Sequence, residues 1–99
     1  MNQYEIVGKR ILQARTEKGM SQEELGKLVG NIGRSGVYSY EKGKYKAITF
    51  EKIEQFANAL DVTLEWLWYG RGEKNVISIS DLTEEQIVLL KNYKERIKG

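Results

Sequence analysis

The sequence predicts an all-α protein in which five short helices form one domain and a sixth, C-terminal helix follows it. Three observations support this fold class. The 99 residues include no proline, a residue that breaks helix interiors. Apolar residues recur three and four positions apart, which is the period of a helix with one buried face. Two capping boxes, which mark helix N-termini, begin at Ser21 and Thr83.

The first three helices each have a start or stop signal. The first is expected from about Tyr4 to Lys18, before a glycine suited to a helix C-terminus. The second follows the Ser21 capping box and runs through Val29, and the third covers about 34–42. The residues expected to face inward are Ile6, Val7, Ile11 and Ala14 in the first helix, Leu25, Leu28 and Val29 in the second, and Val37 and Tyr40 in the third.

Two further helices begin after Thr49 and Thr63, residues favoured at the N-cap. Glycines at 70 and 72 end the compact part of the chain, so the predicted domain covers residues 1–72. The inward residues are expected to be Phe50, Ile53, Phe56, Ala57 and Leu60 in the fourth helix and Leu64, Leu67 and Trp68 in the fifth.

Residues 73–99 are expected to form a linker and an amphipathic C-terminal helix. A lone helix cannot bury its apolar stripe, so the tail is expected to pair with a second subunit, to fold back on its own domain or to bind another protein. Dimerisation is the favoured interpretation. The stripe consists of Ile87, Leu90, Tyr93 and Ile97.

Composition excludes most catalytic chemistry. The chain has no cysteine and no histidine, which removes disulfides, thiolate metal sites, imidazole acid–base catalysis and nearly every zinc site. The paired glutamates at 23–24 and 84–85 lie in first helical turns, where the helix dipole favours them. We therefore expect no enzymatic activity, no metal and no cofactor. Because no apolar run is long enough to span a membrane and no signal peptide is evident, we expect a cytoplasmic protein.

The net charge of +2 is small, but the basic residues are concentrated locally. The stretch 34–50 holds four cations against one acid, whereas 51–65 holds four acids against one base. A local cluster of cations is what phosphate binding requires, although solvated lysines alone would give the same pattern. The four cations are Arg34, Lys42, Lys44 and Lys46.

The second and third helices have the character of a helix-turn-helix. Gly26 is small at the point where two helices crossing at about 90–120° would meet. The third helix is too short to be stable alone, so its apolar side must be held from behind. A helix supported in this way fits the major groove of B-DNA. The residues left facing outward are Arg34, Ser35, Tyr38 and Ser39.

Four stretches stand in a telling order and spacing: Arg15-Thr-Glu-Lys-Gly19-Met-Ser-Gln22-Glu-Glu-Leu25-Gly26, Val29-Gly30, Val37-Tyr-Ser-Tyr40-Glu41-Lys-Gly43 and Leu60-Asp-Val62-Thr-Leu64-Glu-Trp66-Leu67. On these stretches the sequence from Ile6 to about Gly72 resembles the lambda-repressor-like (Cro-type, XRE-type) helix-turn-helix domains of phage and bacterial regulators. Between the turn glycine and Arg34 the chain has three residues, one more than the commonest family pattern.

The resemblance implies roles for matching positions. Gln22 is expected to contact the DNA backbone and brace the reading helix, and Arg15 and Glu41 to form a bridge between the first and third helices. Arg34, Ser35 and Ser39 fall where the family reads base edges, with Tyr38 beside them. Arginine can bond guanine O6 and N7 together, whereas phosphate contacts position a protein without reading sequence. Lys44 and Lys46, in the loop after the reading helix, suit phosphate contacts.

These features predict a sequence-specific DNA-binding transcriptional regulator. We expect a phage or bacterial repressor, associated with the nucleoid, that binds a palindromic operator in the major groove of double-stranded DNA as a homodimer. A regulatory protein partner is a further expectation. The alternative is an antitoxin-like autoregulatory protein whose C-terminal helix binds a partner protein.

Overall fold

The computed structural model describes residues 1–45, 47–76 and 85. The expected fold class is confirmed. Within the described residues the only extended pairing is an isolated bridge between Val62 and Asn75. The expected C-terminal helix and its stripe (Ile87, Leu90, Tyr93 and Ile97) lie outside the described residues. The five helices are α1 (Gln3–Glu17), α2 (Gln22–Leu28), α3 (Gly33–Glu41), α4 (Phe50–Leu60) and α5 (Leu64–Tyr69).

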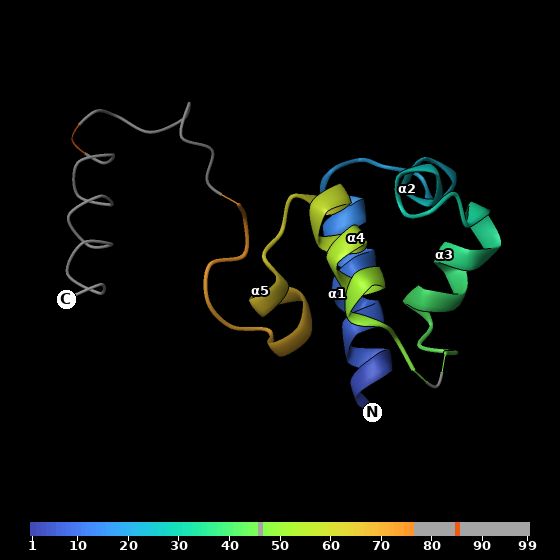
Figure 1. The fold of residues 1–99 in the computed structure, drawn as a ribbon, viewed down its shortest axis with the longest axis horizontal. Coiled ribbons are helices and arrows are strands. Elements are labelled where there is room, and N and C mark those ends of the chain that lie inside the picture. Colours follow the sequence, from blue (N-terminus) through green and yellow to red (C-terminus); the bar gives the residue numbers. More distant parts are fainter. Residues whose placement is uncertain (46, 77–84, 86–99) are drawn as a thin grey trace.

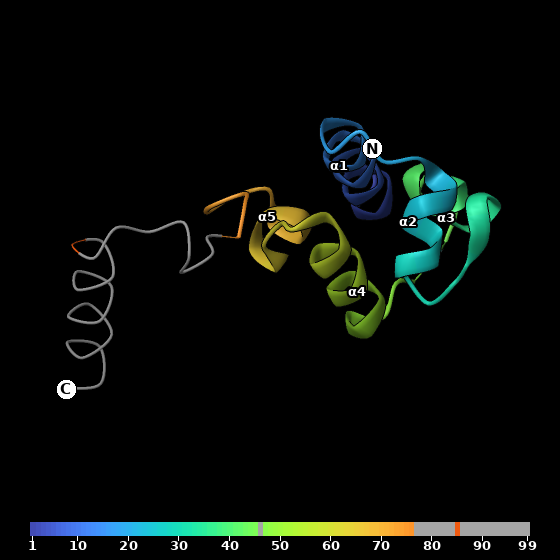
Figure 2. The same ribbon diagram turned by 90° about the horizontal axis from the view of Figure 1, so that it is seen from above.

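The helices divide the domain into two sides. Helices α1 and α4 lie next to each other in the middle, with α2 and α3 on one side and α5 on the other (Figures 1 and 2). One buried core joins all five helices. Its fully buried large side chains are Val7, Ile11, Leu25, Val29, Val37, Phe56, Leu60 and Leu67.

Side-chain caps start four of the five helices, as the sequence predicts for three of them. The Ser21 hydroxyl accepts from the Glu24 amide, and the Glu24 carboxylate accepts from the Ser21 amide, which completes the predicted capping box. Thr49 and Thr63 cap α4 and α5 in the same way, and Asn2 caps α1. Observed helix ends fall within about one residue of those expected, as is usual for sequence-based boundaries.

Two residues expected to face inward do not. Leu28 is 58% exposed and Phe50 is 70% exposed. Helix α2 has seven residues, and its buried side is formed by Leu25 and by the C-cap residue Val29, four positions further on, with Leu28 beside them. Phe50 is the first residue of α4. Helical side chains lean toward the N-terminus, so this first residue has no preceding turn to pack on.

Glycines allow α3 to approach its two neighbours closely. A Cβ atom at Gly26 of α2 would lie 2.7 Å from the carbonyl oxygen of Gly33. A Cβ at Gly8 of α1 would lie 2.4 Å from the carbonyl oxygen of Glu41 and 2.5 Å from that of Tyr40. Real Cβ atoms do not come so near to backbone oxygens. The contacts of α3 with α1 and α2 therefore require glycine at both crossings.

Replacing Gly8 with alanine should destabilise the domain by about 1–3 kcal/mol, because the added methyl group meets rigid backbone rather than a mobile side chain. Alanine's better helix propensity, worth about 1 kcal/mol, would act in the opposite direction. Urea unfolding of Gly8→Ala and of the exposed neighbour Lys9→Ala measures the difference. An unfolding free energy equal to or above wild type for Gly8→Ala would show that the crossing is not tight.

Candidate nucleic-acid interface

Helix α3 has a buried side and an exposed polar side. Val37 and Glu41 are buried against α1 and α2. The residues expected to read bases lie on the other side of the helix: Arg34, Ser35 and Tyr38 are exposed, and Ser39 is half-buried. The structure thus brings all four onto one short helix. Their contacts with bases stay a prediction.

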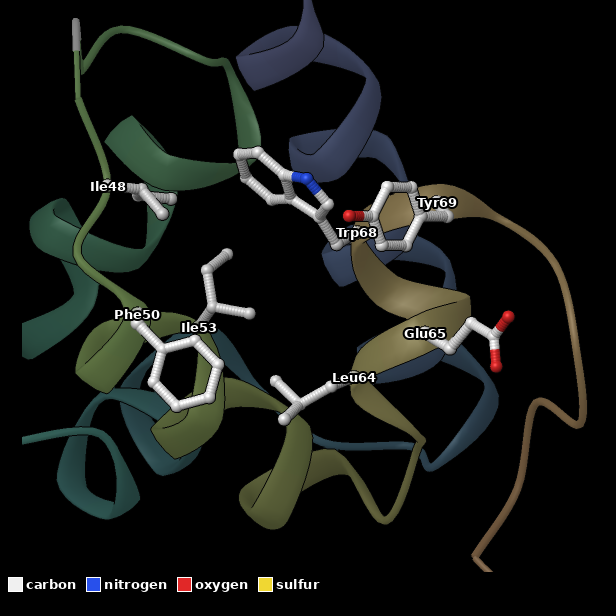
Figure 3. Close-up of a pocket in the computed structure, with 7 residues that line it drawn as sticks. All are labelled: Ile48, Phe50, Ile53, Leu64, Glu65, Trp68 and Tyr69. Carbon is white, nitrogen blue, oxygen red and sulfur yellow. The ribbon is translucent and has the colours of Figure 1, made fainter.

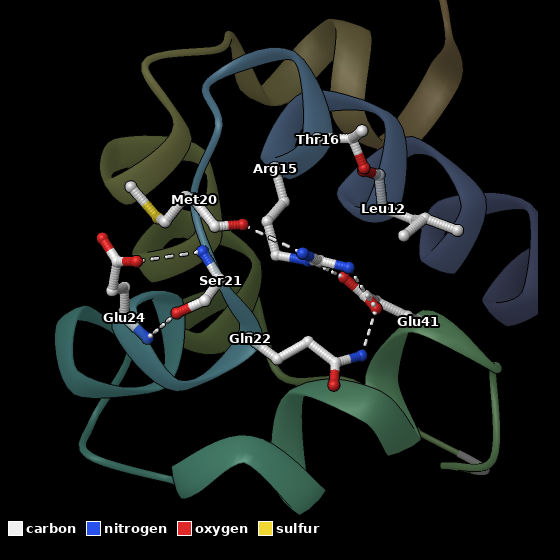
Figure 4. A network of polar contacts seen from close by, with 8 residues as sticks. All are labelled: Leu12, Arg15, Thr16, Met20, Ser21, Gln22, Glu24 and Glu41. Carbon is white, nitrogen blue, oxygen red and sulfur yellow. Dashed lines mark hydrogen bonds and ion pairs between the residues drawn. The ribbon is translucent and has the colours of Figure 1, made fainter.

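The carboxylate of Glu41 lies at the junction of three helices (Figure 4). Arg15 from α1 donates from Nε to Glu41 Oε2 at 2.6 Å and from Nη2 to Oε1 at 3.3 Å. Gln22 from α2 donates from Nε2 to Oε1 at 2.8 Å. The remaining Arg15 nitrogen, Nη1, donates to the carbonyl of Met20 at 2.9 Å, in the loop between α1 and α2. We call Arg15, Gln22 and Glu41 the Glu41 cluster.

Burial makes the Glu41 cluster energetically important. Glu41 is 6% exposed and is the one buried charged residue in the described part of the chain. A charge taken out of water is tolerated only when partners replace its hydration. Here two side chains supply three N–H donors, and the arginine contributes a compensating positive charge. The cluster therefore fixes the C-terminal end of α3 relative to α1 and α2.

The position of Gln22 agrees with the bracing role that the resemblance implies. Its amide nitrogen is engaged by Glu41, and the residue opens α2 directly after the Ser21 cap. A phosphate bound by the Gln22 side chain would lie at the N-terminus of α2, where the first backbone N–H groups of a helix have no partner within the helix. That contact stays a prediction.

The turn between α2 and α3 adopts left-handed backbone geometry. Gly30 has φ +66° and Asn31 has φ +53°, and the Ile32 amide donates to the carbonyl of Gly26 at 3.0 Å. Helix α3 then begins at Gly33, one residue earlier than expected, without a side-chain cap. Gly36 has a packing role here, since a Cβ at that position would lie 2.9 Å from the Ile32 side chain. Ile32, one of the three turn residues, therefore packs against α3.

Two lysines flank the exposed face of α3. Lys44 Nζ lies 4.9 Å from the centroid of the Tyr38 ring, and Lys42 Nζ lies 5.7 Å from it, both within cation–π range. Lys44 is exposed, as a phosphate contact requires. Lys46 lies outside the described residues. Lys42 was not among the expected site residues, although its place directly after α3 in a basic stretch was a usable signal.

Aromatic side chains pack beneath the loop that follows α3. The Tyr40 ring stacks on Tyr45 at 4.0 Å between centroids and meets the edge of Phe56 at 5.1 Å. The pKa of the Tyr40 phenol is raised, mainly by burial and to a smaller extent by the neighbouring Tyr45. The phenol is therefore neutral at ordinary pH. Tyr40 is thus part of the interior rather than a platform for a base.

A comparison with protein families gives the class. The helix-turn-helix family model matches residues 11–67, more than half of the chain. The protein belongs to the helix-turn-helix family of the lambda-repressor-like, XRE type, and is a DNA-binding transcription regulator. No helix within the described residues is long and apolar enough to cross a membrane.

Three solved structures share this fold. The restriction-modification controller protein C.AhdI from Aeromonas hydrophila is 38% identical, with a TM-score of 0.56 over 62% of this chain and 89% of that one. The P22 c2 repressor, solved in complex with a synthetic operator, is 24% identical, with a TM-score of 0.60 over 67% of this chain and 97% of that one. A chain of the SinR–SinI protein complex is also 24% identical, with a TM-score of 0.60 over 93% of this chain and 97% of that one.

Replacing Arg15 with alanine should destabilise the domain by about 3–5 kcal/mol, because it leaves the buried Glu41 carboxylate without its positive partner. The exposed ion pair between Lys18 and Asp61 provides the control, and Lys18→Ala should change stability by at most about 1 kcal/mol. Urea unfolding at neutral pH measures both. Similar small losses for the two variants would show that the Glu41 cluster does not hold the domain together.

Proposed function

We propose that this protein is a repressor that binds a palindromic operator as a homodimer and reads it with α3 in the major groove. The observation that carries the proposal is the supported position of α3. The helix is only nine residues long, yet the Glu41 cluster and two glycine crossings hold it with its polar side exposed. A helix is about 10–12 Å wide with side chains, which matches the major groove of about 12 Å.

Within α3 we assign base reading to Arg34, Ser35, Tyr38 and Ser39. Arg34 carries most of the specificity, because a guanidinium can donate to guanine O6 and N7 together. It lies near the start of α3, where helix-turn-helix proteins usually contact base edges. Serine hydroxyls donate or accept equally well and discriminate less. Tyr38 is exposed, and its aromatic ring suits contact with a thymine methyl group.

We assign phosphate binding to the rim of this surface, to Gln22, Lys44 and Lys46, and we add Lys42. In the free protein Lys42 and Lys44 lie over the Tyr38 ring. Lysine side chains are long and flexible, and their charge attracts phosphates on either side of the groove. These contacts position the protein on DNA without reading its sequence.

A homodimer follows from the small size of the reading surface. One helix of this length contacts only a few base pairs, which is too little to single out an operator. Two copies related by a two-fold axis would place their α3 helices in successive major grooves, about 34–36 Å apart, on a palindromic site. Occupation of such a site would block polymerase where the operator overlaps a promoter. The fold shared with the operator-bound P22 c2 repressor supports this proposal.

Selection of bound duplexes from a random DNA pool, at physiological salt, tests the function directly. The wild-type protein should enrich a two-fold symmetric motif. Arg34→Ala should lose about 1–3 kcal/mol per subunit on that motif and relax the preference at one base pair in each half-site. Lys44→Ala should weaken binding to all sequences alike and reduce the slope of log affinity against log salt concentration by about one per subunit.

The exposed lysine at position 27 of α2 gives a matched control, since Lys27→Ala removes the same charge outside the loop after α3. An unsymmetric motif would contradict the homodimer on a palindrome. Identical behaviour of Arg34→Ala and Lys44→Ala would show that α3 is not the base-reading element, and failure to enrich any sequence would contradict specific DNA binding.

A further inference from the structure

Helix α3 ends in a turn that folds the chain back over its last residues. Lys42 is the C-cap, and Gly43 follows it in left-handed geometry with φ +67°. The Gly43 amide donates to the Tyr40 carbonyl at 3.1 Å, and the Lys44 amide donates to the Ser39 carbonyl at 3.0 Å. These two bonds form a Schellman motif, in which the residue after the glycine frequently contacts the last turn of the helix.

This backbone geometry brings two lysines to one aromatic ring. Lys44 is the residue after the glycine, and its position in the motif faces the residue six places earlier, which is Tyr38. Lys42 follows Tyr38 by four positions, so these two side chains are neighbours on the helix surface. The ammonium groups of Lys44 and Lys42 accordingly lie 4.9 Å and 5.7 Å from the centroid of the Tyr38 ring. The turn itself therefore sets the arrangement.

The turn is anchored to the rest of the domain. A Cβ atom at Gly43 would lie 2.6 Å from the Cα atom of Glu5, so the backbone of the turn packs directly on α1. Directly after the second lysine, the Tyr45 ring stacks on the Tyr40 ring. The backbone that carries both lysines is thus held in place next to Tyr38 on both sides of Lys44.

Two positive charges beside one exposed ring favour an anion as ligand. Both lysines are exposed and Tyr38 is 44% exposed. Among the residues that the structure describes, neither Lys42 nor Lys44 pairs with a carboxylate. Like charges gathered in one small region repel each other, and a phosphate that binds beside them relieves the repulsion. Because an ammonium group has three N–H donors, it can stay over the ring while it donates to a phosphate oxygen.

We infer that Tyr38 is a positioning residue whose ring gathers Lys42 and Lys44 at the end of α3, where the two ammonium groups bind the DNA backbone as a pair. The inference rests on the proposed function and deepens it, since it adds a second task to the base contact assigned to Tyr38. Ordering a free lysine side chain on binding costs free energy, and the ring reduces that cost beforehand. Tyr38 therefore strengthens the part of DNA binding that does not depend on sequence.

Proton NMR of the free, full-length protein tests the arrangement without DNA. The ring current of Tyr38 should move the ε-methylene resonances of Lys42 and Lys44 to higher field than those of Lys27, an exposed lysine on α2. Tyr38→Phe keeps the ring and should retain these shifts, whereas Tyr38→Leu should abolish them. Ordinary resonances for both lysines in the wild-type protein would overturn the inference and leave the proposed function untouched.

Binding to a random-sequence duplex tests the effect on phosphate contacts. Tyr38→Leu should weaken this binding by about two- to fivefold per subunit, the size expected for the loss of an exposed cation–π contact. Tyr38→Phe should bind as the wild type does. In a background that carries both Lys42→Ala and Lys44→Ala, Tyr38→Leu should have no further effect, because the ring acts only through the two lysines.

Three results of the binding experiment would overturn the inference. An equal further loss in the double-alanine background would show that Tyr38 contacts DNA directly. Unchanged binding of Tyr38→Leu would show that the lysines need no support, and equal losses for Tyr38→Phe and Tyr38→Leu would trace the effect to the hydroxyl group. A wild-type protein that shows the NMR shifts but binds no duplex would instead contradict the proposed function, and the phosphate role of Tyr38 would fall with it.

Discussion

The buried carboxylate of Glu41 is the interaction on which the rest of the structure depends. Helix α3 is too short to persist by its own hydrogen bonds, so its position comes from its neighbours. Apolar packing of Val37 holds one point of the helix, and the ion pair with Arg15, joined by the Gln22 amide, holds its C-terminal end. Because an unpaired carboxylate is costly in the interior, arrangements of α1, α2 and α3 that separate Glu41 from Arg15 are disfavoured. The exposed polar side of α3 is thereby held in one orientation relative to the rest of the domain.

The close helix crossings and the second half of the domain follow from this constraint. Short hydrogen bonds from Arg15 and Gln22 require α3 to lie near both neighbours, and Gly8 and Gly26 make that approach sterically possible. On the other side of α1, Arg10 Nη1 donates to the carbonyls of Leu67 and Trp68 at the end of α5. Helix α1 thus connects the side of the molecule that carries α3 to the side that carries α5.

Much of the fold could be predicted from the sequence because its signals are local. The Ser21 capping box, the threonine caps of α4 and α5 and the glycine at the α2–α3 crossing each depend on residues near one another in the chain. The Arg15–Glu41 pair spans 26 positions, and only the family resemblance pointed to it. Helical periodicity wrongly predicted that Leu28 and Phe50 are buried. Periodicity alone does not tell whether an apolar residue at the edge of a helical face has another helix to pack against. The apolar pocket between α4 and α5 (Figure 3) could not be predicted either, since it forms only when the two helices pack together.

Native-state hydrogen exchange of a Glu41→Gln variant tests most directly whether the Glu41 carboxylate holds α3 in place. The substitution keeps the shape of the side chain but removes the charge that Arg15 neutralises. Amides of α3, from Val37 to Glu41, should lose protection well before those of α4, because they would open locally without global unfolding. If α3 and α4 lost protection equally, or if α3 kept its wild-type protection, the carboxylate would not be what holds α3 in place.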